Sequence, residues 1–131
     1  MTAQVAVFCD AATDERGKLS LLGAFDTLCS SQMPAVHPQC AVALRLTFTV
    51  ADEGSHTLRV ALVDPDGRAV LPPVQIPVEI ALPEDLHFGT RNFIFNLQQV
   101  RFATPGIYSA DVTLDDKPLI SIPLQVRLIE A

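Results

Sequence analysis

The 131-residue sequence has no tryptophan, one tyrosine and seven phenylalanines. Sugar-binding sandwiches stack ligands on exposed aromatic rings, so the missing tryptophan disfavours a carbohydrate site. The chain also has only nine lysines and arginines, scattered along its length, and a net charge of −6. Because nucleic acids and anionic membranes are bound by clustered basic side chains, this scarcity disfavours both as partners.

Several sequence motifs are missing as well. No apolar run approaches the roughly 18 residues of a membrane span, and the start, MTAQVAVFCDAATDERG, has neither the basic nor the apolar region of a secretion signal. Cys9, Cys29 and Cys40 form no CxxC pair, which predicts reduced thiols in a cytoplasm. No glycine-rich phosphate loop or GxSxG motif occurs, so the sequence predicts no cofactor and disfavours serine chemistry.

Alternation of apolar and polar residues is the dominant pattern. In CAVALRLTFTV, the side chains of Val42, Leu44, Leu46, Phe48 and Val50 share one face, as a half-buried strand requires. Similar segments are VQIPVEIAL, LISIPLQVRL, HTLRVALV, NFIFNL and IYSADVTL. Two further strands are expected at Ala3 to Ala11 and Lys18 to about Leu28, with a bulge at Gly23. No segment of twelve or more residues keeps a helical period between caps.

Prolines and turn residues divide the strands. Pro77 and Pro123 fall on outward faces, which predicts edge or locally bulged strands. TDERG and DPDG place Gly17 and Gly67 at turn positions, DDKP closes the last hairpin, and LPEDLHFG could form one helical turn. The phase of Phe102 differs from that of Phe93 and Phe95, which predicts a strand that changes sheets there. Residues 1–131 therefore predict one antiparallel β-sandwich domain of about seven or eight strands.

The segment TPGIYSADV resembles the tyrosine corner of immunoglobulin-like and fibronectin-like sandwiches. The resemblance gives Gly106 and Tyr108 structural roles, with the phenol hydrogen-bonded to a backbone group nearby. An antibody domain would place a cysteine at Ala110 and a tryptophan in its core, and this chain has neither. The wider immunoglobulin-like class is therefore the better match.

A resemblance also covers nearly the whole chain. It runs from VAVFCDAATDERGKLSLLGAFDTL through HTLRVALVDPDG to PGIYSADVTLDDKPLISIPLQV. These strand and turn segments are similar to a family of small bacterial and phage-borne domains of unknown function, which brings no activity with it.

An acidic end is the first candidate site. If consecutive strands run antiparallel, the connections at 12–17, 52–56, 83–91 and 115–118 share one end of the sandwich. That end would hold eight of the fifteen acidic residues: Asp14, Glu15, Asp52, Glu53, Glu84, Asp85, Asp115 and Asp116. Asp14, Glu15, Asp115 and Asp116 are the weak candidates for a divalent-cation site. Solvated turns explain the same residues more simply, because no spacing resembles an EF-hand loop.

A nucleophilic cysteine is the second candidate. Such a thiol needs a lowered pKa and a base within hydrogen-bond reach. Cys9 is expected in mid-strand, facing the core. Cys29 and Cys40 flank SSQMPAVHPQ, so His37 forms the best available pair with either of them. A loop histidine and small packed cysteines are the simpler interpretation.

These observations favour a non-enzymatic interaction or assembly module that binds a protein partner or forms a homo-oligomer. The alternatives are a module that binds a cation or small ligand at the acidic end and, less favoured, a thiol-dependent enzyme. A fold alone does not choose among them.

Overall fold

The protein is all-β in a computed structural model that describes residues 1–130. Among these residues the structure has nine strands and one short 3₁₀ turn, η1. Their bounds are β1 Thr2–Glu15, β2 Lys18–Phe25, β3 Thr27–Ser30, β4 Ala35–Phe48, η1 Val50–Asp52, β5 Gly54–Val63, β6 Val74–Ile80, β7 Gly89–Phe102, β8 Gly106–Leu114 and β9 Lys117–Leu128. No helix in the described chain has the length and apolar character needed to cross a membrane.

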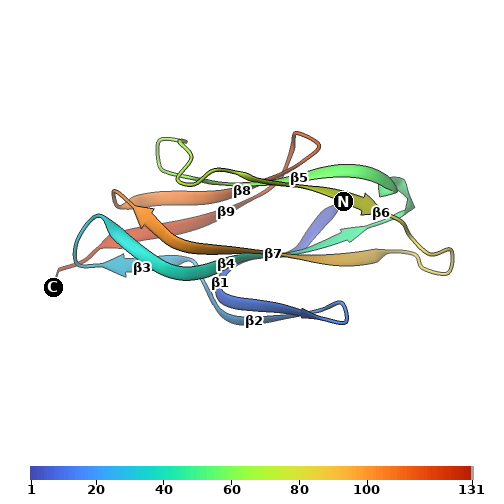
Figure 1. Ribbon diagram of the computed structural model, residues 1–131, viewed down its shortest axis with the longest axis horizontal. Helices are drawn as coiled ribbons and strands as arrows, with labels where there is room; N and C mark the ends of the chain where they lie inside the picture. The colour runs from blue at the N-terminus through green and yellow to red at the C-terminus, as the bar shows by residue number, and fades with distance from the viewer. Residues whose placement is uncertain (131) are drawn as a thin grey trace.

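The strands form two packed sheets, as Figure 1 shows. The four-stranded sheet has the order β2-β1-β4-β7, and the five-stranded sheet has the order β3-β9-β8-β5-β6. Neighbouring strands are antiparallel except β3 and β9, which run parallel. The prediction of an all-β structure with two sheets is confirmed. The ninth strand arises because the segment expected as one strand, Lys18 to Leu28, leaves the first sheet at Asp26 and continues as β3 in the second.

The main core lies between the sheets and follows the predicted alternation. Val42, Leu44, Leu46 and Phe48 of β4 are buried. Val50 is the exception, because its side chain is 67% exposed. The strand ends at Phe48, and Asp52 then bonds to Thr49 in both directions: its carboxylate accepts from the Thr49 amide at 2.9 Å, and its own amide donates to the Thr49 carbonyl at 2.9 Å. These bonds place Val50 in η1 and out of the alternation.

Strand β1 belongs to two layers. Its residues up to Cys9 pair with β4, whereas Ala11–Glu15 pair only with β2. Figure 1 shows β1 turning sharply, so that the β1–β2 hairpin lies against the outer face of its own sheet. Arg45 of β4 donates to the Gly17 carbonyl at 2.8 Å, and Asn92 of β7 donates to Asp14 at 3.1 Å. These hydrogen bonds attach the tip of the β1–β2 hairpin to β4 and β7.

A second, small core lies beneath this hairpin. Cys9, Ala41 and Ala43 are fully buried there, with Ala12 and Ile94 packed against them. Cys9 is expected in mid-strand, facing the core; it is fully buried in β1, but in this second core and not in the main core between the sheets. The neighbouring Phe8 occupies the main core, so alternation turns Cys9 to the opposite face.

Gly23 lies opposite Asp10 at the bend of β1. The predicted bulge is absent there, because the β1–β2 register is constant from Phe8↔Phe25 to Glu15↔Lys18. The glycine is instead required by its backbone, with φ of +65°, and by the close approach of Asp10. A Cβ atom at this position would lie 2.9 Å from the Asp10 Cγ and closer still to its carboxylate.

Replacing Gly23 by alanine should therefore lower the free energy of unfolding by more than the ~1–2 kcal/mol of a left-handed alanine alone. Gly17→Ala is the matched control, because Gly17 has φ of +80° and open space around its Cα. Urea denaturation should give a larger loss for Gly23→Ala, and Asp10→Ala in that background should recover the difference. Equal losses at the two glycines would contradict this account of the bend.

Tyr108 stands at the start of β8 and is 2% exposed. Its hydroxyl donates to the Thr104 carbonyl at 2.7 Å, and its ring meets Phe102 edge-on with 5.0 Å between centroids. The side chain therefore fixes the connection between β7 and β8. Gly106, the first residue of β8, has φ of +147°, and a Cβ atom there would lie 2.6 Å from the Pro65 side chain.

The two prolines lie where a strand has no partner on one side. Pro77 is in β6, the outer strand of the five-stranded sheet. Pro123 is in the part of β9 that pairs with β8 but not with β3, because β3 begins its pairing at Gln125. The prediction of an edge strand is confirmed for β6, whereas β9 is an inner strand whose second neighbour, β3, does not reach Pro123.

Three local expectations are wrong. His37 lies in β4 rather than in a loop, because β4 begins at Ala35. Phe102 remains in the same sheet as Phe93, paired with Ala35, and the change of phase occurs at Gln99, whose φ is +50°. LPEDLHFG forms no helical turn; it contains a turn closed by the Leu86 amide and the Pro83 carbonyl at 3.0 Å.

Candidate functional site

The acidic residues of the predicted end fall into separate groups. Asp115 lies in the β8–β9 turn and bonds to the start of β5: its carboxylate accepts from the Thr57 amide at 2.8 Å and from His56 Nδ1 at 2.6 Å. The other ring nitrogen of His56 donates to the Asp52 carbonyl at 2.5 Å. The Asp52 carboxylate binds the N-terminal ammonium of Met1 at 3.0 Å. This group joins η1, β5 and the β8–β9 turn.

Asp14 belongs to a different layer. It caps the β1–β2 turn by accepting from the Gly17 amide at 3.0 Å, and it bonds to Asn92 on the outer face of the four-stranded sheet. Glu15 pairs with Lys18 across the same hairpin. Asp116 is exposed beside Asp115 and has φ of +65°. Within residues 1–130, no group of three or more histidine, cysteine, aspartate or glutamate side chains is arranged to hold a metal ion.

The electrostatics of His56 follow from its two acceptors. The hydrogen bond to Asp115, and next that to the Asp52 carbonyl, raise the pKa of His56. The hydrogen bond from His56, followed by that from the Thr57 amide, lowers the pKa of Asp115. Only the imidazolium can donate from both ring nitrogens, so this site stabilises protonated His56.

His56→Gln should destabilise the protein more at about pH 5 than at about pH 8. Because the folded-state pKa is raised, the stabilisation is full below the unfolded value of about 6.5 and is lost as pH rises through the folded value. Urea denaturation at the two pH values measures this. His87→Gln, in an exposed loop position, is the control. Equal losses for His56→Gln at both pH values would contradict the assignment.

Two of the three cysteines are buried, and their thiols are poorly ionised. Burial, with a smaller contribution from the neighbouring Cys9, raises the pKa of Cys40 to about 11. Burial, followed by the charge of Asp10, raises the pKa of Cys9. A nucleophilic cysteine needs the opposite shift, because the thiolate is the reactive species.

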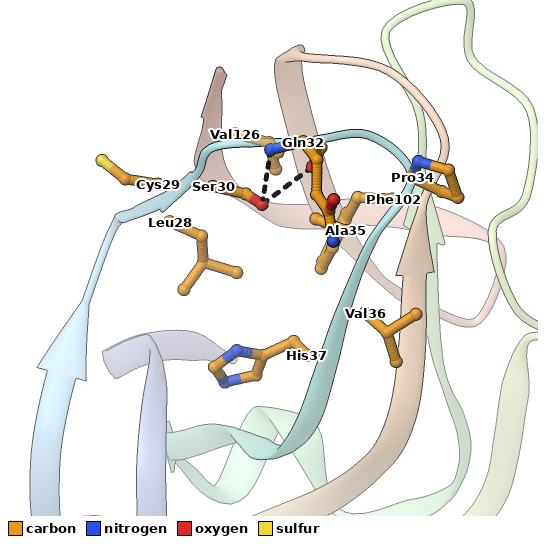
Figure 2. Close-up of a pocket in the computed structure, with 10 residues that line it drawn as sticks. All are labelled: Leu28, Cys29, Ser30, Gln32, Pro34, Ala35, Val36, His37, Phe102 and Val126. Carbon is orange, nitrogen blue, oxygen red and sulfur yellow. Dashed lines mark hydrogen bonds between the residues drawn. The ribbon is translucent and has the colours of Figure 1, made fainter. Parts of the chain in front are cut away.

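Cys29 and His37 line one pocket of about 370 Å³, between the β3–β4 connection and the ends of β7 and β9 (Figure 2). The Cys29 side chain points away from the imidazole in Figure 2. The His37 ring packs on Phe25, with 5.8 Å between centroids, and its Nε2 is buried without a hydrogen-bond partner among the described residues. Ser30 is occupied by Gln32, donating to its carbonyl at 2.8 Å and accepting from its amide at 3.3 Å. Cys29 and His37, the predicted pair, therefore line the same pocket, but their side chains do not contact each other as a nucleophile and its base would.

Thiol labelling at neutral pH should separate the three cysteines. Exposed Cys29 should react with a disulfide reagent in a fast phase, and buried Cys9 and Cys40 should react only as the protein unfolds. Cys29→Ser should abolish the fast phase. Fast labelling of Cys40 in the folded protein would contradict the burial described here.

The outer edge of β7 is an unpaired strand edge that sequence reasoning missed. β7 is an end strand of its sheet, and within Gly89–Phe102 it has no proline, lysine or acidic residue. Natural edge strands usually carry such residues to prevent pairing with other chains. The segment NFIFNLQQV contains the sequence signal for an open edge, which is the absence of proline, lysine and acidic residues, but its alternation alone indicates only a core strand.

A groove opens beside this edge, between the two sheets, with a volume of about 340 Å³. We call it the β7 groove. It is lined by Val42, Val60, Leu62, Leu71, Pro72, Val74, Phe95, Asn96, Leu97, Gln98 and Ala110. Most of these side chains are apolar, and Leu71 and Leu97 are partly buried against the main core. The groove therefore gives access to the core along an unpaired strand.

Comparison with known proteins gives a family and no activity. A family of unknown function (DUF6941) matches residues 4–127. No curated protein and no solved structure matches the chain. The matched range begins in β1 and ends in β9, so it includes both sheets. The chain belongs to the family of unknown function DUF6941.

Proposed function

We propose that this protein is a non-enzymatic, immunoglobulin-like sandwich that acts as a protein-interaction module. We place it in a reducing cytoplasm, since all three cysteines are free, and we infer that its relatives are small bacterial and phage-borne domains.

The strand order supports the immunoglobulin-like assignment. Immunoglobulin domains form one sheet from strands A, B, E and D and the other from C, F and G. Here β1, β4 and β7 take the places of A, B and E, and β5, β8 and β9 take those of C, F and G, in the same chain order. The tyrosine corner marks the start of strand F, and Tyr108 stands at the start of β8. Strands β2 and β3 are then insertions between A and B.

One difference from that topology carries the functional proposal. Strand D would pair with E, but the strand between β5 and β7, which is β6, pairs with β5 instead. The place beside β7 is therefore left without a strand, next to the apolar β7 groove. Unpaired backbone groups next to apolar surface are what binding sites for protein chains offer. The high apolar content, 49% of residues, agrees with this use of the surface.

The thiol chemistry supports a non-enzymatic role. The raised pKa values of Cys9 and Cys40 oppose nucleophilic catalysis, and Cys29 points away from His37. We give no weight to the cation-binding alternative, because Asp115 is engaged by His56 and Thr57 while Asp14 binds Asn92 in another layer.

The test is recovery of a defined partner. The protein, tagged and expressed at its natural level, should co-purify with one stoichiometric protein, and the two purified proteins should form a complex on size exclusion. The same tag on an unrelated protein is the control. Sedimentation of the purified protein reports self-association, which would also support an interaction function. A chain that is recovered alone and sediments as a monomer at high micromolar concentration would overturn the proposal.

A further inference from the structure

We infer that the outer edge of β7 binds an extended segment of another protein by β-strand addition. This segment has apolar residues at alternate positions and an acidic residue at the end that lies beside Arg101. This inference rests on the proposed interaction function and names the site and chemistry of the partner.

The backbone of β7 determines the conformation of the partner. Residues 93–102 form a long edge whose outward N–H and C=O groups have no strand beside them, in two extended stretches on either side of Gln99, whose φ of +50° changes the phase of alternation. A partner satisfies this row of donors and acceptors only as a strand, since each inter-strand hydrogen bond requires extended backbone at the matching spacing.

The β7 groove predicts that every second side chain of the partner is apolar. Side chains of an added strand point in turn to the two faces of the sheet, so every second residue would face the other sheet. On that side lie Leu71, Val74 and Leu97, which are apolar and half-buried or partly exposed. Val74 is 41% exposed and Leu71 is half-buried, so both can contact an added side chain. Alternate apolar residues in the partner would cover them.

The charge of this edge predicts an acidic residue at one end of the partner and disfavours a second copy of this chain as the partner. Strands β4 and β7 together contain no aspartate or glutamate, and their charged residues are Arg45, Arg91 and Arg101. A second β7 would bring two further arginines and no acid. An acidic residue at the end of the partner complements exposed Arg101.

One end of the edge is already closed. Arg91 donates to the Glu79 carbonyl of β6 at 2.9 Å and lies over the Phe93 ring, 5.3 Å from its centroid. Its guanidinium therefore spans the space between the sheets near the β6–β7 connection. We expect the partner to occupy the edge from Phe93 toward Phe102, with Arg101 as the free charged contact.

The probe for the test is a fluorescent nonapeptide with valine at every second position, threonine between the valines and glutamate at each end. It should bind the full chain at least about tenfold more tightly than a peptide of the same composition with broken alternation, since several valine side chains lose their apolar contacts. Hydrogen exchange should show new protection in residues 93–102. No binding, or protection confined to other strands, would overturn the inference.

Two pairs of variants locate the site. Val74→Asp should reduce peptide affinity at least about tenfold by placing a charge in the β7 groove, whereas Ile107→Asp, at a residue 58% exposed on β8, should leave it unchanged. Arg101→Glu should weaken binding about two- to fivefold and strengthen binding of a lysine-ended peptide similarly. Circular dichroism confirms that each variant is folded. Equal losses for the Val74 and Ile107 variants would contradict the site.

Binding of a co-purified natural partner to these variants tests the β7 site separately from the proposed interaction function. If a co-purified partner binds Val74→Asp as well as the unchanged protein, the interaction function stands and the β7 site is wrong. If Val74→Asp loses the partner and Ile107→Asp keeps it, both stand. A self-associated form that Val74→Asp dissociates would identify a second copy as the occupant and would overturn the acidic partner.

Discussion

The bend of β1 at Asp10 is the constraint on which the arrangement of the first thirty residues depends. Because Gly23 has a left-handed backbone and no side chain, β2 can follow β1 through the bend without losing register. The hairpin then covers the outer face of the four-stranded sheet and creates a second buried layer around Cys9. After the hairpin, the chain crosses at Asp26 to the other sheet, where the Asp26 carbonyl accepts from the Gln125 amide at 2.8 Å. One bend thus positions β2, the crossing and β3.

This crossing gives the two lateral sides of the sandwich different characters. On the β1 side, the chain passes directly from one sheet to the other, and β1 lies close to β9. On the β7 side, the chain passes between the sheets through the connections before and after β7, residues 81–88 and 103–105, and Arg91 bridges one end. On the β1 side, β1 lies close to β9, whereas the side between β7 and β6 leaves both strand edge and core accessible. The asymmetry therefore explains why an interaction surface would lie at β7.

Alternation in the sequence predicts most of the strands and the main core, because period-two burial depends only on local geometry. Val42, Leu44, Leu46 and Phe48 illustrate this, as do the outward prolines Pro77 and Pro123. Features set by contacts between distant residues could not be found in the same way. The buried layer at Cys9 depends on a hairpin that folds back, and the phase change in β7 depends on the backbone of Gln99, a residue type that gives no warning of a positive φ.

The acidic end illustrates the same limit in the candidate site. Assigning each connection to one end of the sandwich predicts how far along the strands its acidic residues lie. It does not predict in which layer of the sandwich each residue lies. Asp14 and Asp115 both lie in the expected turns, yet one carboxylate faces Asn92 outside the four-stranded sheet and the other binds His56 at the start of β5. The distance between layers is about 10 Å, which is too large for carboxylates to share one ion. Layering therefore leaves Asp14 and Asp115 each paired with nearby donors instead of with each other, whereas the outer edge of β7 has backbone groups without a neighbouring strand.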